Sequence, residues 1–255
     1  MSDAMTMVWR NVRHTRRNPG TIVMTIGLPV LLLLLFVGVF GSTLSAGFGS
    51  SWRGADYIDY VLAGVLLMTV GYGSTTTALA VNRDMTEGII NRFRTMAISR
   101  TSVLTGHVVG SCVRTLVSAA LVVLVALGLG LRLDSGPLGW LGAAGLLTLL
   151  TIAMTWLGVA VGLAAKTAEA TAPFTLVTQL LPFLSSAFVP PEAMDGAVRW
   201  FAAHEPFTPI IDTLRGLLLG TRLGHDWIVA VAWCVALALA GYLWARTLFR
   251  RDPRG

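Results

Sequence analysis

The sequence predicts an all-α, polytopic membrane protein, and three observations carry this prediction. Hydrophobic residues make up 55% of the 255 residues and charged residues only 13%, and the mean hydropathy is +0.72. Soluble domains carry about 25% charged residues, so a surface this poor in charge suits lipid better than water. Six long apolar runs follow one another along the chain, without period-two alternation. Because lipid offers the backbone no hydrogen-bond partner, such runs favour helices over a closed barrel.

The six expected membrane spans are apolar runs of about 20 residues or more, the length that a helix needs to cross a bilayer. We expect them to form a single membrane domain over residues 1–255. Pro29 lies near the start of the first run, as a kink or an early-turn residue, and the fifth run contains Pro173 and Pro182. The expected spans cover approximately residues 21–44, 57–81, 103–131, 138–165, 170–189 and 227–248.

The stretch from Pro190 to Asp226, between the fifth and sixth spans, is too polar to cross a membrane and too long for a tight turn. Its apolar spacing predicts two short outer helices, around residues 192–203 and 207–219, separated at Pro206. We interpret His204–Glu205–Pro206 as a polar turn between these helices rather than as a metal or acid–base site.

The distribution of arginine and lysine predicts that both termini are cytoplasmic, which an even number of spans requires. The membrane is expected to be the inner (plasma) membrane. The basic residues lie on separate cytoplasmic edges rather than in one patch, which argues against binding of nucleic acid. With the N-terminus inside, most of them fall in inner segments, and the outer loops hold only Arg53, Arg132, Arg199, Arg215 and Arg222.

Residues 82–100, between the second and third spans, have the pattern of an amphipathic helix on the cytoplasmic side. From the pattern alone, a helix lying at the lipid interface is the favoured interpretation. The apolar face holds Ile89, Ile90, Phe93, Met96 and Ala97, and the polar face holds Glu87, Asn91, Arg92 and Arg94.

Several catalytic and energy-coupling patterns are absent from the sequence. It contains no Gly-x-x-x-x-Gly-Lys-Ser/Thr phosphate loop, no Gly-x-Ser-x-Gly elbow and no histidine pair with metal-ligand spacing. We therefore expect no catalytic residue, metal or cofactor on this chain. Arg114 is the one clear charge within a span, and it either pairs with a neighbouring helix or takes part in substrate recognition. An ion-coupled secondary transporter, the main alternative, normally carries an ionisable relay inside its spans; an intramembrane enzyme would need a catalytic group there.

Four stretches resemble the type-2 ABC exporter permeases, in particular the daunorubicin-resistance permease group of actinobacteria. Together with the six-span layout, the resemblance covers nearly the whole chain. The second and fourth stretches are the specific ones. They are YIDYVLAGVLLM at 57–68, NRDMTEGIINRFRTMAISRTSVLTGHVVG at 82–110, KTAEATAPF at 166–174 and FLSSAFVPPEAMDGAVRWFAAHEPFTPIIDTLRGLLLG at 183–220.

The resemblance implies an ATP-driven exporter built from two permease copies and two separate ATPase subunits, which bind ATP and Mg²⁺. Residues 82–100 would be the coupling helix that docks on the ATPase, and residues 190–220 would be re-entrant or capping helices on the outer side. The substrate would be an amphiphilic drug, antibiotic or lipid-like compound. Coupling would involve Glu87, Ile90, Arg92, Phe93 and Met96.

Candidate residues for the substrate path come from the second and fifth spans, where apolar and polar side chains mix. Arg114 is added because it is charged and lies within a span. The remaining candidates are Met68, Tyr72, Thr75, Phe174, Gln179 and Phe183.

Overall fold

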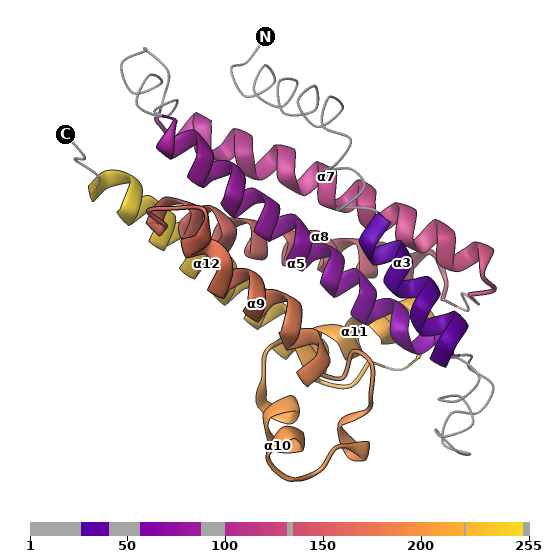
Figure 1. Cartoon of the computed structure of the whole chain (residues 1–255). Coiled ribbons are helices and arrows are strands. Elements are labelled where there is room, and N and C mark those ends of the chain that lie inside the picture. Colours follow the sequence, from indigo (N-terminus) through magenta and orange to yellow (C-terminus); the bar gives the residue numbers. More distant parts are fainter. Residues whose placement is uncertain (1–26, 41–56, 88–99, 132–134, 222, 252–255) are drawn as a thin grey trace.

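The computed structural model describes residues 27–40, 57–87, 100–131, 135–221 and 223–251, and within these ranges it contains helices and no strand. The chain is therefore an all-α protein, as the sequence predicts (Figure 1). In order, the elements are α3 (Leu28–Leu35), η2 (Phe36–Phe40), α5 (Tyr57–Thr86), α7 (Arg100–Gly128), α8 (Pro137–Ala164), η4 (Glu169–Thr171), α9 (Ala172–Leu180), η5 (Leu181–Leu184), η6 (Pro191–Ala193), α10 (Gly196–His204), α11 (Phe207–Leu219) and α12 (Asp226–Arg251).

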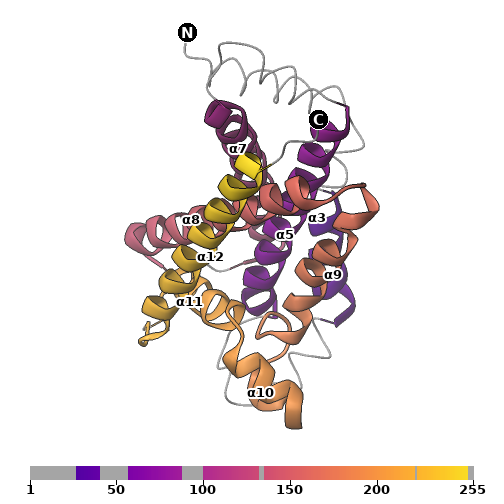
Figure 2. The same ribbon diagram turned by 90° about the vertical axis from the view of Figure 1, so that its left-hand side faces the viewer.

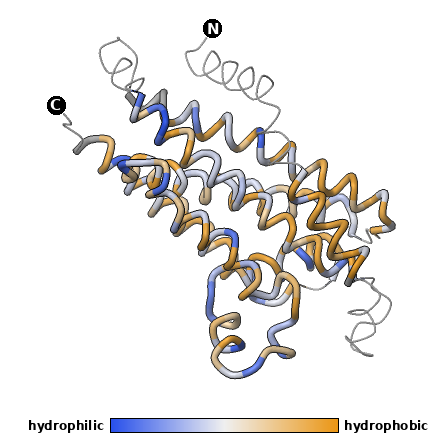
Figure 3. Tube along the Cα trace, viewed as in Figure 1, coloured by the Kyte–Doolittle hydropathy of each residue, from blue (hydrophilic) through white to orange (hydrophobic). Residues whose placement is uncertain are grey.

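Four of these helices are long and apolar enough to cross a membrane: α5, the Leu104–Gly128 part of α7, α8, and the Asp226–Phe249 part of α12. They coincide within a few residues with the second, third, fourth and sixth expected spans. Figure 3 shows hydrophobic positions along the lengths of these helices. The first expected span is described only over residues 27–40, where Pro29 lies in the first turn of α3.

Helix α5 is the centre of the bundle, and most of its residues are buried. It packs against α3, α7, α8, α9 and α11, which explains why it is buried on several sides. Helix α12 packs mainly along α8 and exposes most of its apolar residues. Exposed apolar side chains on a long helix are expected where the neighbour is lipid rather than water.

The fifth expected span is shorter and less regular than the sequence predicts. The 3₁₀ turn η4, helix α9 and the 3₁₀ turn η5 follow one another from Glu169 to Leu184, and the backbone becomes extended at Ser185. Pro182 has no N–H for the helical ladder and lies where the α-helix gives way to η5. Residues 185–189, assigned to the span from the sequence, therefore form a turn.

After this turn the chain builds a projection and then returns to the bundle (Figure 2). The projection contains η6 and α10, whose residues are mostly exposed. Helix α11 re-enters and packs against α5, α8 and α12 before ending at Gly220, which has a left-handed φ of 68°. The two outer helices are separated at Pro206, as predicted, but α10 begins only at Gly196 because Pro190 and Pro191 lead into η6.

Candidate functional site

The predicted substrate path falls on two helices that pack against each other, α5 and α9. Thr75 Oγ1 of α5 lies 3.4 Å from Thr178 Oγ1 of α9. In the single permease subunit, Met68 and Thr75 are buried and Tyr72 is partly buried. The structure thus packs the helix that carries the α5 candidates against α9 at a seam near Thr75 and Thr178, and the role of the candidates in transport stays a prediction.

The side of α9 that faces away from α5 is apolar and exposed. Its exposed residues include Leu176, Val177 and Leu180, and Phe183 of η5 continues the row. Phe174 and Gln179 are partly buried. Both amide atoms of Gln179 are shielded from solvent and have no hydrogen-bond partner among the described residues. A shielded amide without a partner is costly, so an additional polar partner at Gln179 would stabilise α9.

Arg114 lies between α7 and α5 rather than on the α9 seam. Its Nη2 donates to Thr76 Oγ1 of α5 over 3.3 Å and to Ser111 Oγ of its own helix over 3.2 Å, while Nε has no partner in the described part of the chain. The structure therefore pairs Arg114 with a neighbouring helix and does not bring it to the Phe174 and Gln179 candidates.

The predicted coupling segment is described only at its edges. Helix α5 continues to Thr86, so the first residues of this segment extend the membrane helix, and Glu87 is exposed directly after it. Ile90, Arg92, Phe93 and Met96 lie outside the described residues.

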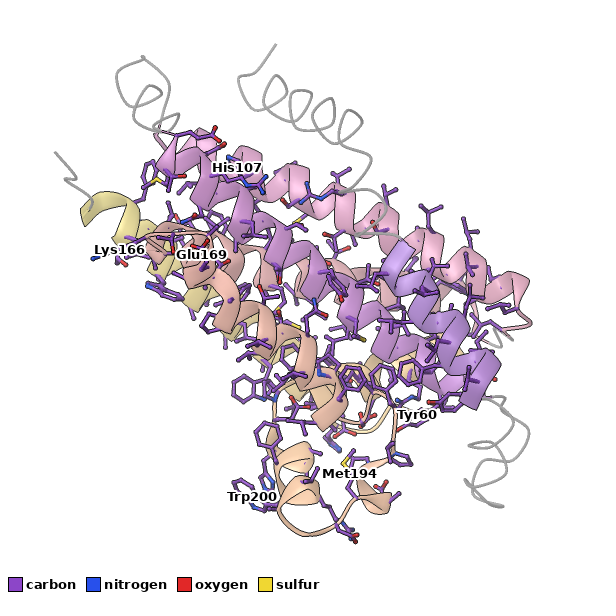
Figure 4. All side chains as sticks on the ribbon, in the orientation of Figure 1. Tyr60, His107, Lys166, Glu169, Met194 and Trp200 are labelled. Atoms are coloured by element: carbon purple, nitrogen blue, oxygen red, sulfur yellow. The ribbon has the colours of Figure 1, made fainter. Side chains whose placement is uncertain are left out.

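Two contacts fix the helix ends that flank this segment. His107 Nε2 of α7 lies 3.0 Å from Asp84 Oδ2 of α5. Asn82 of α5, which is buried, donates from Nδ2 to the carbonyl of Ala165 over 2.7 Å and to that of Gly162 over 3.4 Å. Because Ala165 follows the last residue of α8, Asn82 binds α5 to the start of the loop that follows α8. Figure 4 shows His107, Lys166 and Glu169 at the same end of the bundle.

A polar network joins three segments at the opposite end, where Figure 4 places Tyr60. The carbonyl of Ser186 accepts from the Tyr60 hydroxyl and from Arg215 Nη2, each over 2.7 Å. Arg215 Nη1 pairs with Asp212 Oδ1 at 2.7 Å, and Ser186 Oγ donates to the same oxygen over 2.8 Å. The guanidinium carbon lies 3.7 Å from the centre of the Tyr60 ring, a cation–π distance. The network thus ties α11 to α5 and to the turn after η5.

Sequence reasoning missed this network, because it treated Arg215 only as an outer-loop charge. One local signal was present: Asp212 and Arg215 are three residues apart, the spacing of an ion pair on one helix face. Tyr60 lies 155 positions from Arg215 and 126 from Ser186, and Ser186 lies 29 positions from Arg215, so no local pattern links them.

Glu205 is also more than the polar turn that the sequence suggests. Its buried carboxylate accepts from the backbone N–H groups of Phe207 and Thr208, the first residues of α11. Burial raises the pKa of this carboxyl above its usual value, and the two N–H donors oppose that rise. A carboxylate at a helix N-terminus also complements the helix dipole. Glu205 therefore anchors the start of the re-entrant helix.

The arrangement has two ends: a polar network around α11 and a pair of helix-fixing contacts beside residues 88–99, with α5 connecting them. The profile of the ABC-2 type transporter family matches residues 3–219 of the chain. The chain belongs to the ABC-2 type transporter family. The match ends at the last residue of α11, so α12 lies outside it.

This ABC-2 permease is similar to curated proteins over most of its length. It is 28% identical over 240 residues to the daunorubicin resistance ABC transporter permease protein DrrB1 of Streptomyces coeruleorubidus, which covers 94% of this chain and 82% of the relative. It is 25% identical over 243 residues to the probable doxorubicin resistance ABC transporter permease protein DrrC of Mycobacterium tuberculosis (92% and 84%). It is 25% identical over 234 residues to the putative transport permease ycf38 of Pyropia yezoensis (89% and 78%). The resemblance stated from the sequence is confirmed.

Proposed function

We propose that this chain is the permease subunit of an ATP-driven exporter that moves an amphiphilic drug, antibiotic or lipid-like compound out of the cell. The observation that carries the proposal is the family match over residues 3–219, with relatives named as daunorubicin and doxorubicin resistance permeases. In support of the proposal, the contact between α5 and α9 combines apolar side chains with the hydroxyl groups of Thr75 and Thr178, a mixture that suits a compound with both kinds of surface.

ATP hydrolysis takes place on a separate ATPase subunit, which holds ATP and Mg²⁺. Two features support this division: the sequence has no phosphate loop, and an amphipathic segment lies between α5 and α7. The flanking contacts, Asp84 with His107 and Asn82 with Ala165, connect that segment to α7 and α8. Movement imposed on the segment by the ATPase would therefore reach three membrane helices.

A second permease copy completes the exporter in the bilayer. The exposed apolar row on α9 and η5, beside the Gln179 amide that has no partner within the described ranges, supports placing that copy against α9. The substrate path would then run between the two α5–α9 seams. Both termini and residues 82–100 face the cytoplasm, and the membrane is the plasma membrane, as the distribution of arginine and lysine supports.

The test uses the permease reconstituted with its ATPase subunit, with affinity pull-down and substrate-stimulated ATP hydrolysis as readouts. Phe93→Ala removes an aromatic anchor of the coupling face, and such anchors carry about 2 kcal/mol, equivalent to roughly a thirtyfold loss of ATPase affinity. Glu87→Lys reverses an exposed charge at the start of the segment and is expected to lower stimulation. Trp200→Ala, at an exposed site on α10, is the matched control and should leave both readouts unchanged.

The proposal fails in either of two outcomes. If Phe93→Ala and Glu87→Lys insert normally, bind the ATPase and respond to substrate as the native permease does, residues 82–100 are not the coupling segment. If transport into vesicles proceeds without ATP and follows an imposed ion gradient, the permease is an ion-coupled secondary transporter.

A further inference from the structure

An apolar groove opens between α7 and α8, away from the α5–α9 seam. Its volume is about 480 Å³. One wall is α7, with Leu116, Ala120 and Leu124, and the other wall is α8, with Trp140, Ala144 and Leu147. Leu66 of α5 and Leu214 and Leu218 of α11 close the bottom. The groove is therefore a side entrance into the core of the bundle, and its floor includes the re-entrant helix.

The lining of the groove matches hydrocarbon rather than a polar ligand. It contains no charged residue. The hydroxyl of Thr148 is occupied, because it donates to the carbonyl of Ala144 over 2.7 Å. Trp140, in the first turn of α8, is the other side chain with a polar atom, and tryptophan is typical of the boundary between headgroups and hydrocarbon. A ligand would thus enter past an interfacial rim and meet only apolar surface below it.

The length of the groove corresponds to one leaflet. From Trp140 to Thr148 the α8 wall extends about 12 Å, and from Leu127 to Leu116 the α7 wall extends about 16 Å, at 1.5 Å per helical residue. Half of the hydrocarbon core of a bilayer is about 15 Å thick. Both walls belong to the helix halves on the side of α10 and α11, so the groove spans the leaflet on that side.

The groove is continuous with the surface that faces lipid and distinct from the face proposed for the second copy. Val117 and Leu124 on α7, and Leu138 and Leu141 on α8, are exposed apolar residues beside it. Helix α9 packs against α5 and not along α7 or α8, and Figure 2 shows α8 and α9 on opposite sides of α5. A second copy at α9 would leave this groove open to the bilayer.

We propose that this groove binds one acyl chain of a bilayer lipid from the leaflet on the α10–α11 side. The chain packs against Leu214 and Leu218, which flank Arg215 on α11. Arg215 and Asp212 hold the turn after η5 and the Tyr60 end of α5. A bound acyl chain therefore supports the re-entrant helix on a face next to its polar network. The site is independent of which compound the permease exports.

The experiment uses the full-length permease in nanodiscs that contain a phospholipid with a photoactivatable diazirine near the end of one acyl chain. After illumination, labelled peptides are mapped and quantified. We expect labelling to concentrate on residues 116–127 and 140–148, above the level on the exposed face of α12. Ala144→Phe fills the groove from one wall and Ala120→Phe from the other, and each is expected to reduce this labelling about fivefold or more.

Ala236→Phe adds the same group at an exposed position of α12 outside the groove and is the matched control. It should leave groove labelling unchanged. Using both walls protects the test, because one variant suffices if the other does not fold. Equal labelling of α7, α8 and α12, unaffected by either filling variant, would show ordinary lipid contact and overturn the proposal. Efficient cross-linking between two permease copies through cysteines at position 120 would also overturn it, since a protein surface would then occupy the groove.

Discussion

The close packing of α5 on α8 gives a quantitative prediction at Gly162. A Cβ added there would lie 2.5 Å from the carbonyl oxygen of Ala78 and 2.9 Å from Cβ of Val81. Ordinary contact begins at 3.4 Å, so the two helices would have to separate locally by roughly 0.9 Å. The nearest obstacle is backbone and cannot rotate away. Gly158, one turn earlier on α8, meets the carbonyl oxygen of Ser74 in the same manner.

Overpacking of this kind costs about 1–3 kcal/mol. Alanine also has a helix propensity about 0.8–1.0 kcal/mol better than glycine, which partly offsets the clash. The matched control is Gly145→Ala, on the same helix, where an added Cβ meets nothing within 4 Å. Both variants gain the propensity, so the difference between Gly162→Ala and Gly145→Ala isolates the clash at about 1–3 kcal/mol.

The assay is thermal unfolding of the purified permease, followed by tryptophan fluorescence. One kcal/mol shifts the midpoint by about 2–4 °C for a chain of this size, so Gly162→Ala should unfold about 2–12 °C below Gly145→Ala. Changing Gly158 as well should widen the gap. Equal midpoints for the two single variants would refute the close approach of α5 and α8 and, with it, the rigid connection between the two ends of α5.

Three further predictions concern the ends of the bundle. Arg215→Ala leaves Asp212 without its cation, and the Asp212 side chain is 38% exposed, so solvent screens part of the lost interaction. We expect the free energy of unfolding to fall by about 1–3 kcal/mol. Arg199→Ala, at an exposed position, is the control and should leave the free energy of unfolding unchanged. Asn82→Ala removes the donor to the carbonyl of Ala165 and should lower the free energy of unfolding by about 1 kcal/mol. It should also lower the substrate-stimulated ATPase rate more than the basal ATPase rate, and an unchanged ratio of the two rates would contradict this. The raised pKa of buried Glu205 means that the folded state holds this proton more tightly than the unfolded state. Its contribution to stability is therefore largest below the unfolded-state pKa of about 4.3 and is lost as pH rises through the folded-state pKa. Glu205→Gln should for this reason flatten the pH dependence of the unfolding midpoint at pH values above about 4.3. Parallel pH profiles of the unfolding midpoint for the native protein and Glu205→Gln would contradict this prediction.

The fold class and the positions of the long helices were predictable because they depend on local composition. A run of about 20 apolar residues is sufficient to indicate a spanning helix. For the same reason α11 was predicted at the bounds that the structure gives it, 207–219. The fifth span was predicted less well. Its apolar run continues through Pro182 to Val189, but hydropathy does not register that proline lacks an N–H, and the helical turns end at Leu184.

The residue contacts of the candidate site depended on the tertiary structure. Only the packing showed that Gly158 and Gly162 of α8 face Ser74 and Ala78 of α5. Arg114 was visible as a charge within a span, and the structure chose its pairing with Thr76.

By itself, then, the sequence determined that the chain lies in a membrane, where its long helices run and which family it resembles, since all three follow from residues close together along the chain. The tertiary structure decided that Arg215 of α11 meets Tyr60 of α5 and Ser186 of the turn after η5. It also decided that an apolar groove opens between α7 and α8. The reason is that hydropathy fixes how much of a helix is apolar, whereas small residues, prolines and long-range hydrogen bonds fix which faces meet.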